Sequence, residues 1–314
     1  SRRVNPWSRR NRARRASQVT TRGLLEFAEG HWANAQRLLR RAAPHVEQPL
    51  INYLAAARAA HEQGEYRESD DLLREAYETT PDADVAIAVT QAQLQISRGQ
   101  LEQALATLTR VRKEHPRHLY ALKLMGQLYL RLEDWERLEQ LLPELRRHHL
   151  HTETEQLELE RRVYGALLVQ AGQRAQGVEP GAANPVTGTW ERVPRQLRQD
   201  PALVETYALQ LRAAGAESHA EKVLREALGH AFNDRLVHIY GLVRGSDPAR
   251  QLATAERWLD GHPHDATLLL ALGRLSLRNE LWGKAREYLE ASYANRRDIQ
   301  TCAELVRLLE HMDE

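Results

Sequence analysis

The sequence repeats one helical pattern at a nearly constant spacing, and this repeat limits what the chain can fold into. Repeats start at residues 16, 50, 85 and 119, so that neighbouring starts lie 34 or 35 residues apart. Within each repeat, apolar and small residues recur every three or four positions, which is the spacing of one face of an α-helix. A single helix pair cannot bury its own apolar faces, so each repeat needs neighbours of the same kind. The repeat therefore predicts an all-α protein in which helix pairs stack on one another.

The stretch Asp265–Tyr293 shows the repeat most clearly. Leucines at three- and four-residue spacing form a first stripe, and Gly273 lies on it, where a missing side chain lets a second helix come close. Asn279–Glu280 supplies the turn, and Trp282 and Ala285 then begin the second stripe. This order of leucine, glycine, aromatic residue and alanine, with a period of about 34 residues, is typical of the tetratricopeptide repeat.

The pattern is lost after residue 150 and returns near residue 201. Residues 152–171 predict one long helix, and residues 172–188 predict a loop because they contain four glycines and two prolines. The expected fold is an all-α, right-handed superhelical solenoid of tetratricopeptide repeats with a divergent middle repeat and a long loop. Seven helix pairs and one divergent pair are expected. The predicted parts are a basic segment (1–15), N-terminal repeats (16–150), a divergent helical insert (151–200), and C-terminal repeats with a capping helix (201–314).

Motifs and composition argue against catalysis. The chain has no GxGxxG, GxxxxGK[ST], HExxH or CxxC motif, so neither a nucleotide-binding loop nor a zinc protease helix is expected. The single cysteine, Cys302, excludes an intramolecular disulfide and a cysteine-built zinc site. The sequence offers no run of 18 apolar residues that would cross a membrane. A non-catalytic role follows.

The net charge of +1 conceals an uneven distribution. Residues 1–22 contain eight arginines and no acidic residue, so the remaining chain carries a net charge of −7. An arginine cluster at one end of an acidic body typically meets phosphate, either of lipid head groups or of nucleic acid; the alternative is an ordinary solvated tail. The arginines expected to face lipid are Arg2, Arg3, Arg9, Arg10, Arg12, Arg14 and Arg15.

The first helix of each repeat is expected to line the concave face of the solenoid. The predicted inner positions mix apolar and basic side chains, which suits an acidic, amphipathic peptide or protein surface, or a planar molecule bearing carboxylates. These positions are Leu24, Phe27, Leu54, Arg58, His61, Gln93, Ile96, Lys123, Gln127, Arg131, Leu209, Arg212, Arg274, Leu277 and Arg278.

Three histidines, His148, His149 and His151, invite two interpretations. Clustered imidazoles can bind a transition metal or a haem iron. They also follow Arg146 and Arg147 at a predicted helix end, where positive charge complements the helix dipole. The second interpretation is preferred. No metal and no cofactor is therefore expected, and haem stays open as an alternative.

Several segments resemble the HemY-type proteins of proteobacterial inner membranes. They are RGLLEFAEGHWANAQRLLRRAA, NYLAAARAA, LYLRLEDWERLEQLLPEL and LLLALGRLSLRNELWGKAREYLEAS, and the resemblance runs from about Arg10 to the C-terminus. Members of that family have two transmembrane helices before the arginine cluster and are associated with a late step of protohaem synthesis. The resemblance thus implies a bacterial inner-membrane protein at the cytoplasmic face. It supplies no catalytic residues, and the dinucleotide fingerprint of the unrelated oxidase of the same name is absent.

Three functions remain as hypotheses. The preferred one is a membrane-tethered interaction scaffold that binds haem-biosynthesis enzymes or other proteins through the concave groove and anionic lipid through the arginine cluster. The second is a carrier or regulator that binds haem or porphyrin. The third, a nucleic-acid-binding repeat protein, rests only on the arginine cluster, because the rest of the chain lacks a basic stripe with interleaved aromatic residues. Nucleic acid is therefore not an expected partner.

Overall fold

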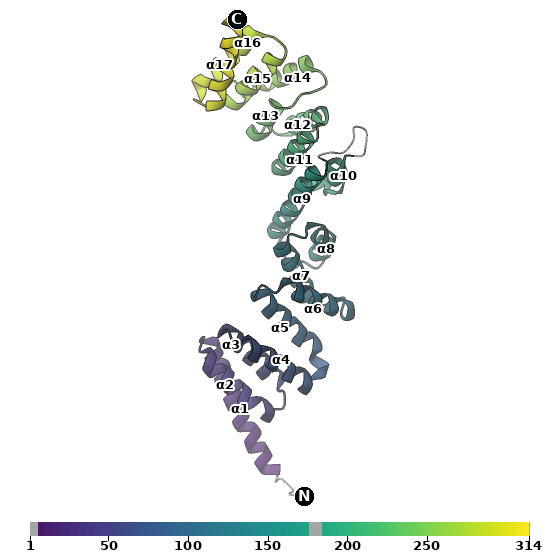
Figure 1. Cartoon of the computed structure of the whole chain (residues 1–314), viewed down its shortest axis with the longest axis vertical. Coiled ribbons are helices and arrows are strands. Elements are labelled where there is room, and N and C mark those ends of the chain that lie inside the picture. Colours follow the sequence, from purple (N-terminus) through teal and green to yellow (C-terminus); the bar gives the residue numbers. More distant parts are fainter. Residues whose placement is uncertain (1–5, 176–183, 314) are drawn as a thin grey trace. The chain divides into compact units, whose positions relative to one another are not determined.

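The computed structural model describes residues 6–175 and 184–313, and most of these residues lie in helices joined by short turns (Figure 1). No strand occurs among them. The contacts divide the chain into two compact units, an N-terminal unit that ends at His151 and a C-terminal unit that begins at Thr152. The expected all-α fold is confirmed.

The N-terminal unit consists of four successive helix pairs. Each second helix follows its first helix after a turn of only a few residues, which is the arrangement that the repeats predict. The helices are α1 (Pro6–Ala28), α2 (Trp32–Ala42), α3 (Leu50–Glu62), α4 (Tyr66–Thr79), α5 (Asp84–Ser97), α6 (Leu101–Glu114), α7 (Leu119–Leu132) and α8 (Trp135–Arg147), with short 3₁₀ turns η1 (Ala43–His45) and η2 (Pro81–Ala83).

The C-terminal unit continues the same plan with four more pairs and a final helix. In chain order its elements are α9 (Glu153–Ala175), α10 (Pro185–Arg192), η3 (Arg195–Leu197), α11 (Pro201–Ala213), α12 (Glu217–His230), α13 (Asp234–Tyr240), α14 (Pro248–Glu256), η4 (Arg257–Asp260), α15 (Ala266–Arg278), α16 (Trp282–Asn295) and α17 (Ile299–Asp313). The divergent pair is α9 and α10, and α17 is the expected capping helix.

Most first helices end in the same left-handed turn. The first or second residue after the helix has a positive φ, and the next backbone N–H donates to the carbonyl five residues earlier, which is the Schellman arrangement. Four turns use glycine and two use glutamate: Gly30, Gly64, Gly99 and Gly215 have φ between 74° and 79°, and Glu133 and Glu280 have φ of 54° and 59°. The six N–H···O distances lie between 2.8 and 3.0 Å. Glycine recurs there because it adopts this conformation without a steric cost.

The two helices of a pair cross where one of them has no side chain. A Cβ atom on Gly273 of α15 would lie 2.5 Å from Cδ2 of Leu289 on α16, closer than real contacts allow. Gly23 of α1 faces Leu39 of α2 in the same way, at 2.8 Å from its Cγ. The close approach that the sequence predicts at Gly273 is therefore confirmed.

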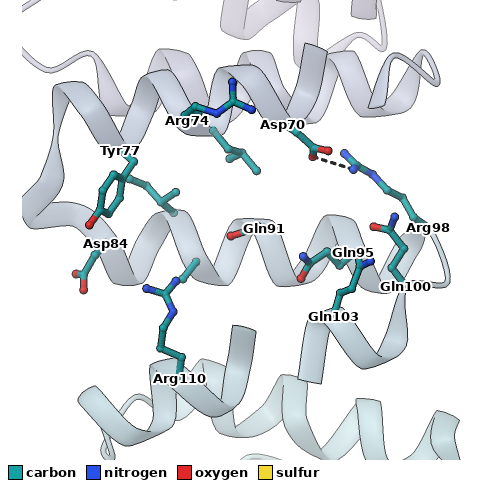
Figure 2. Close-up of a pocket in the computed structure, with 13 residues that line it drawn as sticks. Asp70, Arg74, Tyr77, Asp84, Gln91, Gln95, Arg98, Gln100, Gln103 and Arg110 are labelled. Carbon is teal, nitrogen blue, oxygen red and sulfur yellow. Dashed lines mark hydrogen bonds and ion pairs between the residues drawn. The ribbon is translucent and has the colours of Figure 1, made fainter. Parts of the chain in front are cut away.

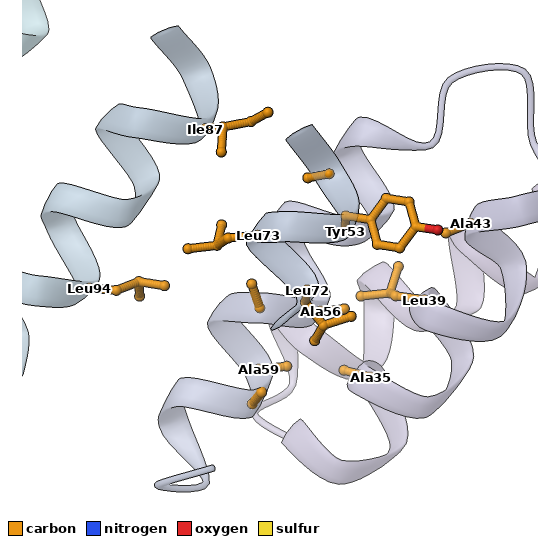
Figure 3. Packing of buried hydrophobic residues seen from close by; sticks show 13 residues of the cluster. Ala35, Leu39, Ala43, Tyr53, Ala56, Ala59, Leu72, Leu73, Ile87 and Leu94 are labelled. Carbon is orange, nitrogen blue, oxygen red and sulfur yellow. The ribbon is translucent and has the colours of Figure 1, made fainter. Parts of the chain in front are cut away.

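Alanine allows similarly close packing in the first half of the N-terminal unit (Figure 3). Four alanines of α3, Ala56, Ala57, Ala59 and Ala60, are completely buried, and the larger side chains of Leu39 and Leu72 fill the space around them. This core fixes how α2, α3 and α4 pack on one another.

The predicted loop at residues 172–188 is wrong at both ends. Gly172 belongs to α9, because the helix packs so closely on α11 that a Cβ atom there would overlap Gln210. Pro185 begins α10, and the side chain of Asn184 caps that helix by accepting a hydrogen bond from the N–H of Val186 at 2.9 Å. The middle of the predicted loop, residues 176–183, lies outside the described residues.

Two glycines of the last helix pair should respond in opposite ways to the same substitution. We expect Gly273→Ala to lower the free energy of unfolding by about 1–2 kcal/mol, because the new methyl group overlaps Leu289. Gly283→Ala should raise it by up to about 1 kcal/mol, because no atom lies within 4 Å of the added Cβ and alanine favours the helix. Denaturation followed by circular dichroism measures both. Equal effects of the two substitutions would contradict the crossing described here.

Candidate partner-binding surfaces

The first helices of the N-terminal unit share one polar surface. Arg58 on α3 donates from Nη2 to Oε1 of Gln93 on α5 at 2.8 Å. Gln93 in turn donates from Nε2 to the hydroxyl of Tyr120 on α7. Nη1 of Arg131 on α7 reaches back to the carbonyl of Ile96 on α5 at 3.3 Å. The structure thus brings predicted inner residues of successive repeats together on one side of the unit.

The other predicted inner residues of this unit differ in exposure. Ile96 does not belong to an accessible surface, because its side chain is only 9% exposed. This corrects the prediction: the register places Ile96 on the inner helix, but the neighbouring helices cover its side chain. Leu24, Arg58, Gln127 and Arg131 are exposed, and Phe27, Leu54, His61, Gln93 and Lys123 are half-buried.

His61 is held by hydrogen bonds on both ring nitrogens. Nε of Arg98 donates to Nδ1 at 3.2 Å, so Nδ1 must be the unprotonated nitrogen. Nε2 then carries the proton and donates to Oγ of Ser97 at 2.8 Å, and that hydroxyl donates to the carbonyl of Leu94 at 2.8 Å. In this arrangement His61 offers no free lone pair to a metal or to a haem iron. Nor can it accept a proton from Ser97, so the pair is no catalytic dyad.

The same contacts lower the pKa of His61. Burial contributes most, the positive charge of Arg98 adds to it, and the carboxylates of Glu62 and Asp70 act in the opposite direction. Arg98 itself is fixed by an ion pair with Asp70 at 2.8 Å and lies over the ring of Tyr66, 4.8 Å from its centre. The imidazole therefore stays neutral at pH 7.

Acid should destabilise the N-terminal unit through His61. In the unfolded chain a histidine titrates near 6.5. Between that value and the lower folded pKa, the unfolded state binds more protons, so stability falls as the pH falls through this window. We expect His61→Gln to flatten the dependence of unfolding free energy on pH between about pH 7 and pH 5. The exposed His45 provides a matched control, and His45→Gln should leave the slope unchanged. If unfolding free energy depends on pH as steeply in His61→Gln as in the wild type, His61 is not the cause of this dependence.

In the C-terminal unit the capping helix removes one predicted inner residue from solvent. Arg274 is only 9% exposed, and its guanidinium donates from Nε to Glu304 at 3.0 Å and from Nη2 to Gln300 at 3.1 Å, both on α17. The prediction that Arg274 is accessible to a partner is therefore wrong, because α17 covers this end of α15. Leu209 and Arg212 are exposed, and Leu277 and Arg278 are half-buried.

Several arginines gather at the ends of the first helices of this unit, and we call Arg212, Arg244 and Arg278 the arginine group. Arg278, the last residue of α15, donates from Nη2 to the carbonyl of Leu242 at 2.8 Å and from Nη1 to that of Val243. Burial lowers the pKa of Arg278, and the nearby charges of Arg244, Arg274 and Arg212 lower it further, while Glu217 opposes them. The positive charges therefore lie close enough to repel one another.

The arginine group is short of acidic partners. The guanidinium groups of Arg212 and Arg244 form no hydrogen bond or ion pair with any described residue. The carboxylate of Glu217 is used by the backbone N–H of Arg244, at 2.6 Å. An incoming carboxylate would thus meet unpaired donors here.

The predicted histidine cluster lies at a helix end, and the structure does not bring its ligand atoms together. His148 caps α8, and His149 has a left-handed backbone with φ of 50°. Among the described residues, three potential metal-ligand atoms approach within 4.8 Å only in two other clusters, Glu26 with Glu29 and His31, and Asp84 with Glu114 and His115. His148, His149 and His151 belong to neither.

From Pro6 onward, the basic segment is part of the first helix. The described α1 begins at Pro6, and Arg12, Arg14 and Arg15 are exposed on it. Arg2 and Arg3 lie outside the described residues, as do the side chains of Arg9 and Arg10. In the part of the chain that the structure describes, no helix is both long enough and apolar enough to cross a membrane.

A pocket that the repeat pattern did not predict lies between α4, α5 and α6 (Figure 2). Its volume is about 450 Å³. The floor is apolar, with Leu73, Ile87 and Ala88, and the other lining residues are polar: Asp70, Arg74, Tyr77, Asp84, Gln91, Gln95, Arg98, Gln100, Gln103 and Arg110. The sequence signal for this pocket is a pair of polar residues four positions apart on α5, Gln91 and Gln95. The pocket was missed because the repeat pattern assigns these positions to the packed interior of a repeat.

Comparison with known proteins gives two family matches. Residues 1–64 match the family described as "HemY protein N-terminus", and residues 60–128 match the family described as "Tetratricopeptide repeat". Protein HemY of Escherichia coli (strain K12) is 27% identical over 307 residues, which cover 98% of this chain and 75% of that protein. The resemblance to HemY-type proteins is therefore confirmed, as is the tetratricopeptide repeat.

Solved structures show lower similarity. A tetratricopeptide repeat protein from Parabacteroides merdae is 16% identical, with a TM-score of 0.40, over 93% of this chain and 98% of that one. Yeast Tom70 is 12% identical, with a TM-score of 0.32, over 96% of this chain and 66% of that one.

Proposed function

We propose that this HemY-type tetratricopeptide repeat protein is a non-catalytic, membrane-tethered scaffold that binds partner proteins in a late step of protohaem synthesis. The similarity to Protein HemY along nearly the whole chain supports the association with that pathway. The helix pairs support a role in protein binding, because stacked repeats present extended surfaces to partners. We place the protein at the cytoplasmic face of the bacterial inner membrane, as the resemblance implies.

The arginine group is the observation that carries the proposal. Arg212 and Arg244 lack acidic partners, and Arg278 uses two of its five N–H donors on carbonyls, which leaves three for a ligand. Leu209, 37% exposed, lies three residues before Arg212 on α11 and so on the same side of that helix. An acidic segment with apolar side chains satisfies both features, since carboxylates pair with the guanidinium groups and apolar residues cover the leucine.

The histidines favour the scaffold over a haem carrier. His61 has both nitrogens occupied, and the ligand atoms of His148, His149 and His151 do not converge. A carrier also has to enclose the apolar macrocycle, because small-molecule pockets bury most of the surface of their ligand. The α5 pocket, defined as the cavity between α4, α5 and α6, is lined mainly by polar groups and does not suit a macrocycle.

Reversing charge in the arginine group should release the partner. With the chain as bait in a detergent extract of bacterial membranes, we expect Arg212→Glu/Arg244→Glu to lower recovery of haem-biosynthesis enzymes at least about tenfold, because like charges then face the acidic segment. Arg250→Glu is the matched control, because Arg250 is exposed on α14 of the same unit, and it should retain them. Equal recovery with both variants would exclude the arginine group as the partner-binding site. Saturable one-to-one haem binding, seen in the Soret band and lost in His148→Ala/His149→Ala/His151→Ala, would favour the carrier instead.

The basic surface of α1 should bind anionic lipid. Each arginine near an anionic surface contributes about 1 kcal/mol. We expect co-sedimentation with vesicles that contain phosphatidylglycerol, little with purely zwitterionic vesicles, and a steep loss as salt increases. Arg12→Ala/Arg14→Ala/Arg15→Ala should weaken binding, and Arg40→Ala/Arg41→Ala on α2 should have a smaller effect. If binding depends neither on the charge of the lipid nor on the salt concentration, these arginines have another role.

A further inference from the structure

The α5 pocket lies on the side of α5 away from the polar surface of the first helices. Successive residues of an α-helix are rotated by about 100°. Gln91 and Gln95 line the pocket, whereas Gln93 contacts Arg58 and Tyr120 on the opposite side. The walls are formed by α4, with Arg74 and Tyr77, and α6, with Gln103 and Arg110 (Figure 2). The pocket is thus separate from the surface on which partners were predicted.

The two glutamines of α5 that line the pocket have the spacing of a peptide main chain. Gln91 and Gln95 are four residues apart, which is about 6 Å along a helix. Two residues of an extended peptide span about 6.6 Å. A carboxamide presents one acceptor and two donors, so each side chain can bond the C=O and the N–H of a peptide unit. Gln91 makes no side-chain hydrogen bond with described residues, and Gln95 only accepts one, from Thr107 at 3.0 Å.

Two arginines that line the pocket have N–H donors without a hydrogen-bond partner in the part of the chain that the structure describes. The side chain of Arg98 is 6% exposed, yet its Nη2 has no hydrogen-bond partner among the described residues, and Arg98 lines the pocket. A buried donor without a partner is costly, and an acceptor of a ligand that bonds to it would offset this cost. Arg110 on the opposite wall likewise makes no ion pair with any described residue. Both donors suit carboxylates.

The acidic residues of the pocket are already engaged. Asp70 pairs with Nη1 of Arg98 at 2.8 Å. Asp84 accepts the N–H of Val85 at 2.8 Å, and its other oxygen lies 3.7 Å from Nε2 of His115. Arg74 is paired with Asp71 at 2.9 Å. The available groups of the pocket are therefore mainly donors, which favours an acidic ligand over a basic one.

We propose that the α5 pocket binds an extended acidic peptide segment of a partner protein, with Gln91 and Gln95 bonded to its main chain and Arg98 and Arg110 to its carboxylates. The stretch from Asp84 to Arg98, which contains the residues of α5 that line the pocket and ends just after the helix, is about 21 Å long. It accommodates about six extended residues. This site is independent of the arginine group, so either can be wrong while the other holds.

Peptide selection on the full chain tests the site. A phage-displayed random heptapeptide library is selected on the wild-type chain, and the enriched peptides are labelled with fluorescein for anisotropy titrations. We expect acidic peptides whose affinity falls about tenfold or more in Gln91→Ala/Gln95→Ala. Gln48→Ala is the matched control, an exposed glutamine of the same unit that does not line the pocket, and it should not change the affinity. Arg110→Ala should weaken binding and raise its tolerance to salt.

Methylation of the peptide tests how the glutamines act. N-methylating the backbone amides that face them removes the donors and should abolish binding, while the peptide's side chains and charge stay the same. Circular dichroism confirms that the variants are folded. If no acidic peptide is enriched, or if the enriched peptides bind Gln91→Ala/Gln95→Ala as well as wild type, the proposal is overturned. Peptides lost only in Arg212→Glu/Arg244→Glu belong to the arginine group and equally count against the α5 pocket.

Discussion

The close crossing of two helices at a residue without a side chain is the contact on which the rest of this structure depends. Gly273 against Leu289 and Gly23 against Leu39 leave no room for a Cβ atom, so the helices of these pairs meet backbone to side chain. The left-handed turn at the end of the first helix directs the chain back for this contact. Because both conditions are local in sequence, they recur with the repeat, and the helix pairs follow from them.

Whether a residue of a first helix is accessible depends on the neighbouring helices. Arg274 and Arg278 are one turn apart on α15. Arg274 is covered by α17 and donates to Glu304 and Gln300 on that helix. Arg278 donates to two carbonyls just after α13 and is only half-buried. Two arginines with the same local sequence signal thus serve different purposes. One attaches the capping helix, and the other contributes to a charged surface.

This difference marks the limit of prediction from the sequence. Gly273 and the turn at Glu280 could be located because backbone conformation and helix crossing are set by residues within one repeat. The burial of Ile96 could not, because it depends on how closely the neighbouring helices lie. Gly172 was misplaced for a related reason. Glycine indicates a loop and a close helix contact equally well, and only the position of Gln210 on α11 decides between them. The pocket beside Gln91 and Gln95 arises from the spacing of α4 and α6, which no single repeat encodes.

The two sides of α5 illustrate how a repeat protein can offer distinct surfaces from one helix. Toward α3 and α7, the amide of Gln93 already bonds Arg58 and Tyr120 and so joins successive repeats. Away from them, Gln91 and Gln95 face a pocket in which Nη2 of Arg98 and the guanidinium group of Arg110 have no partner among the described residues. Unsatisfied donors cost free energy in the isolated chain, and that cost is recovered when a ligand supplies the missing acceptors. By this criterion the side of α5 that faces α4 and α6 is better prepared for a ligand than the side that the repeat pattern singles out.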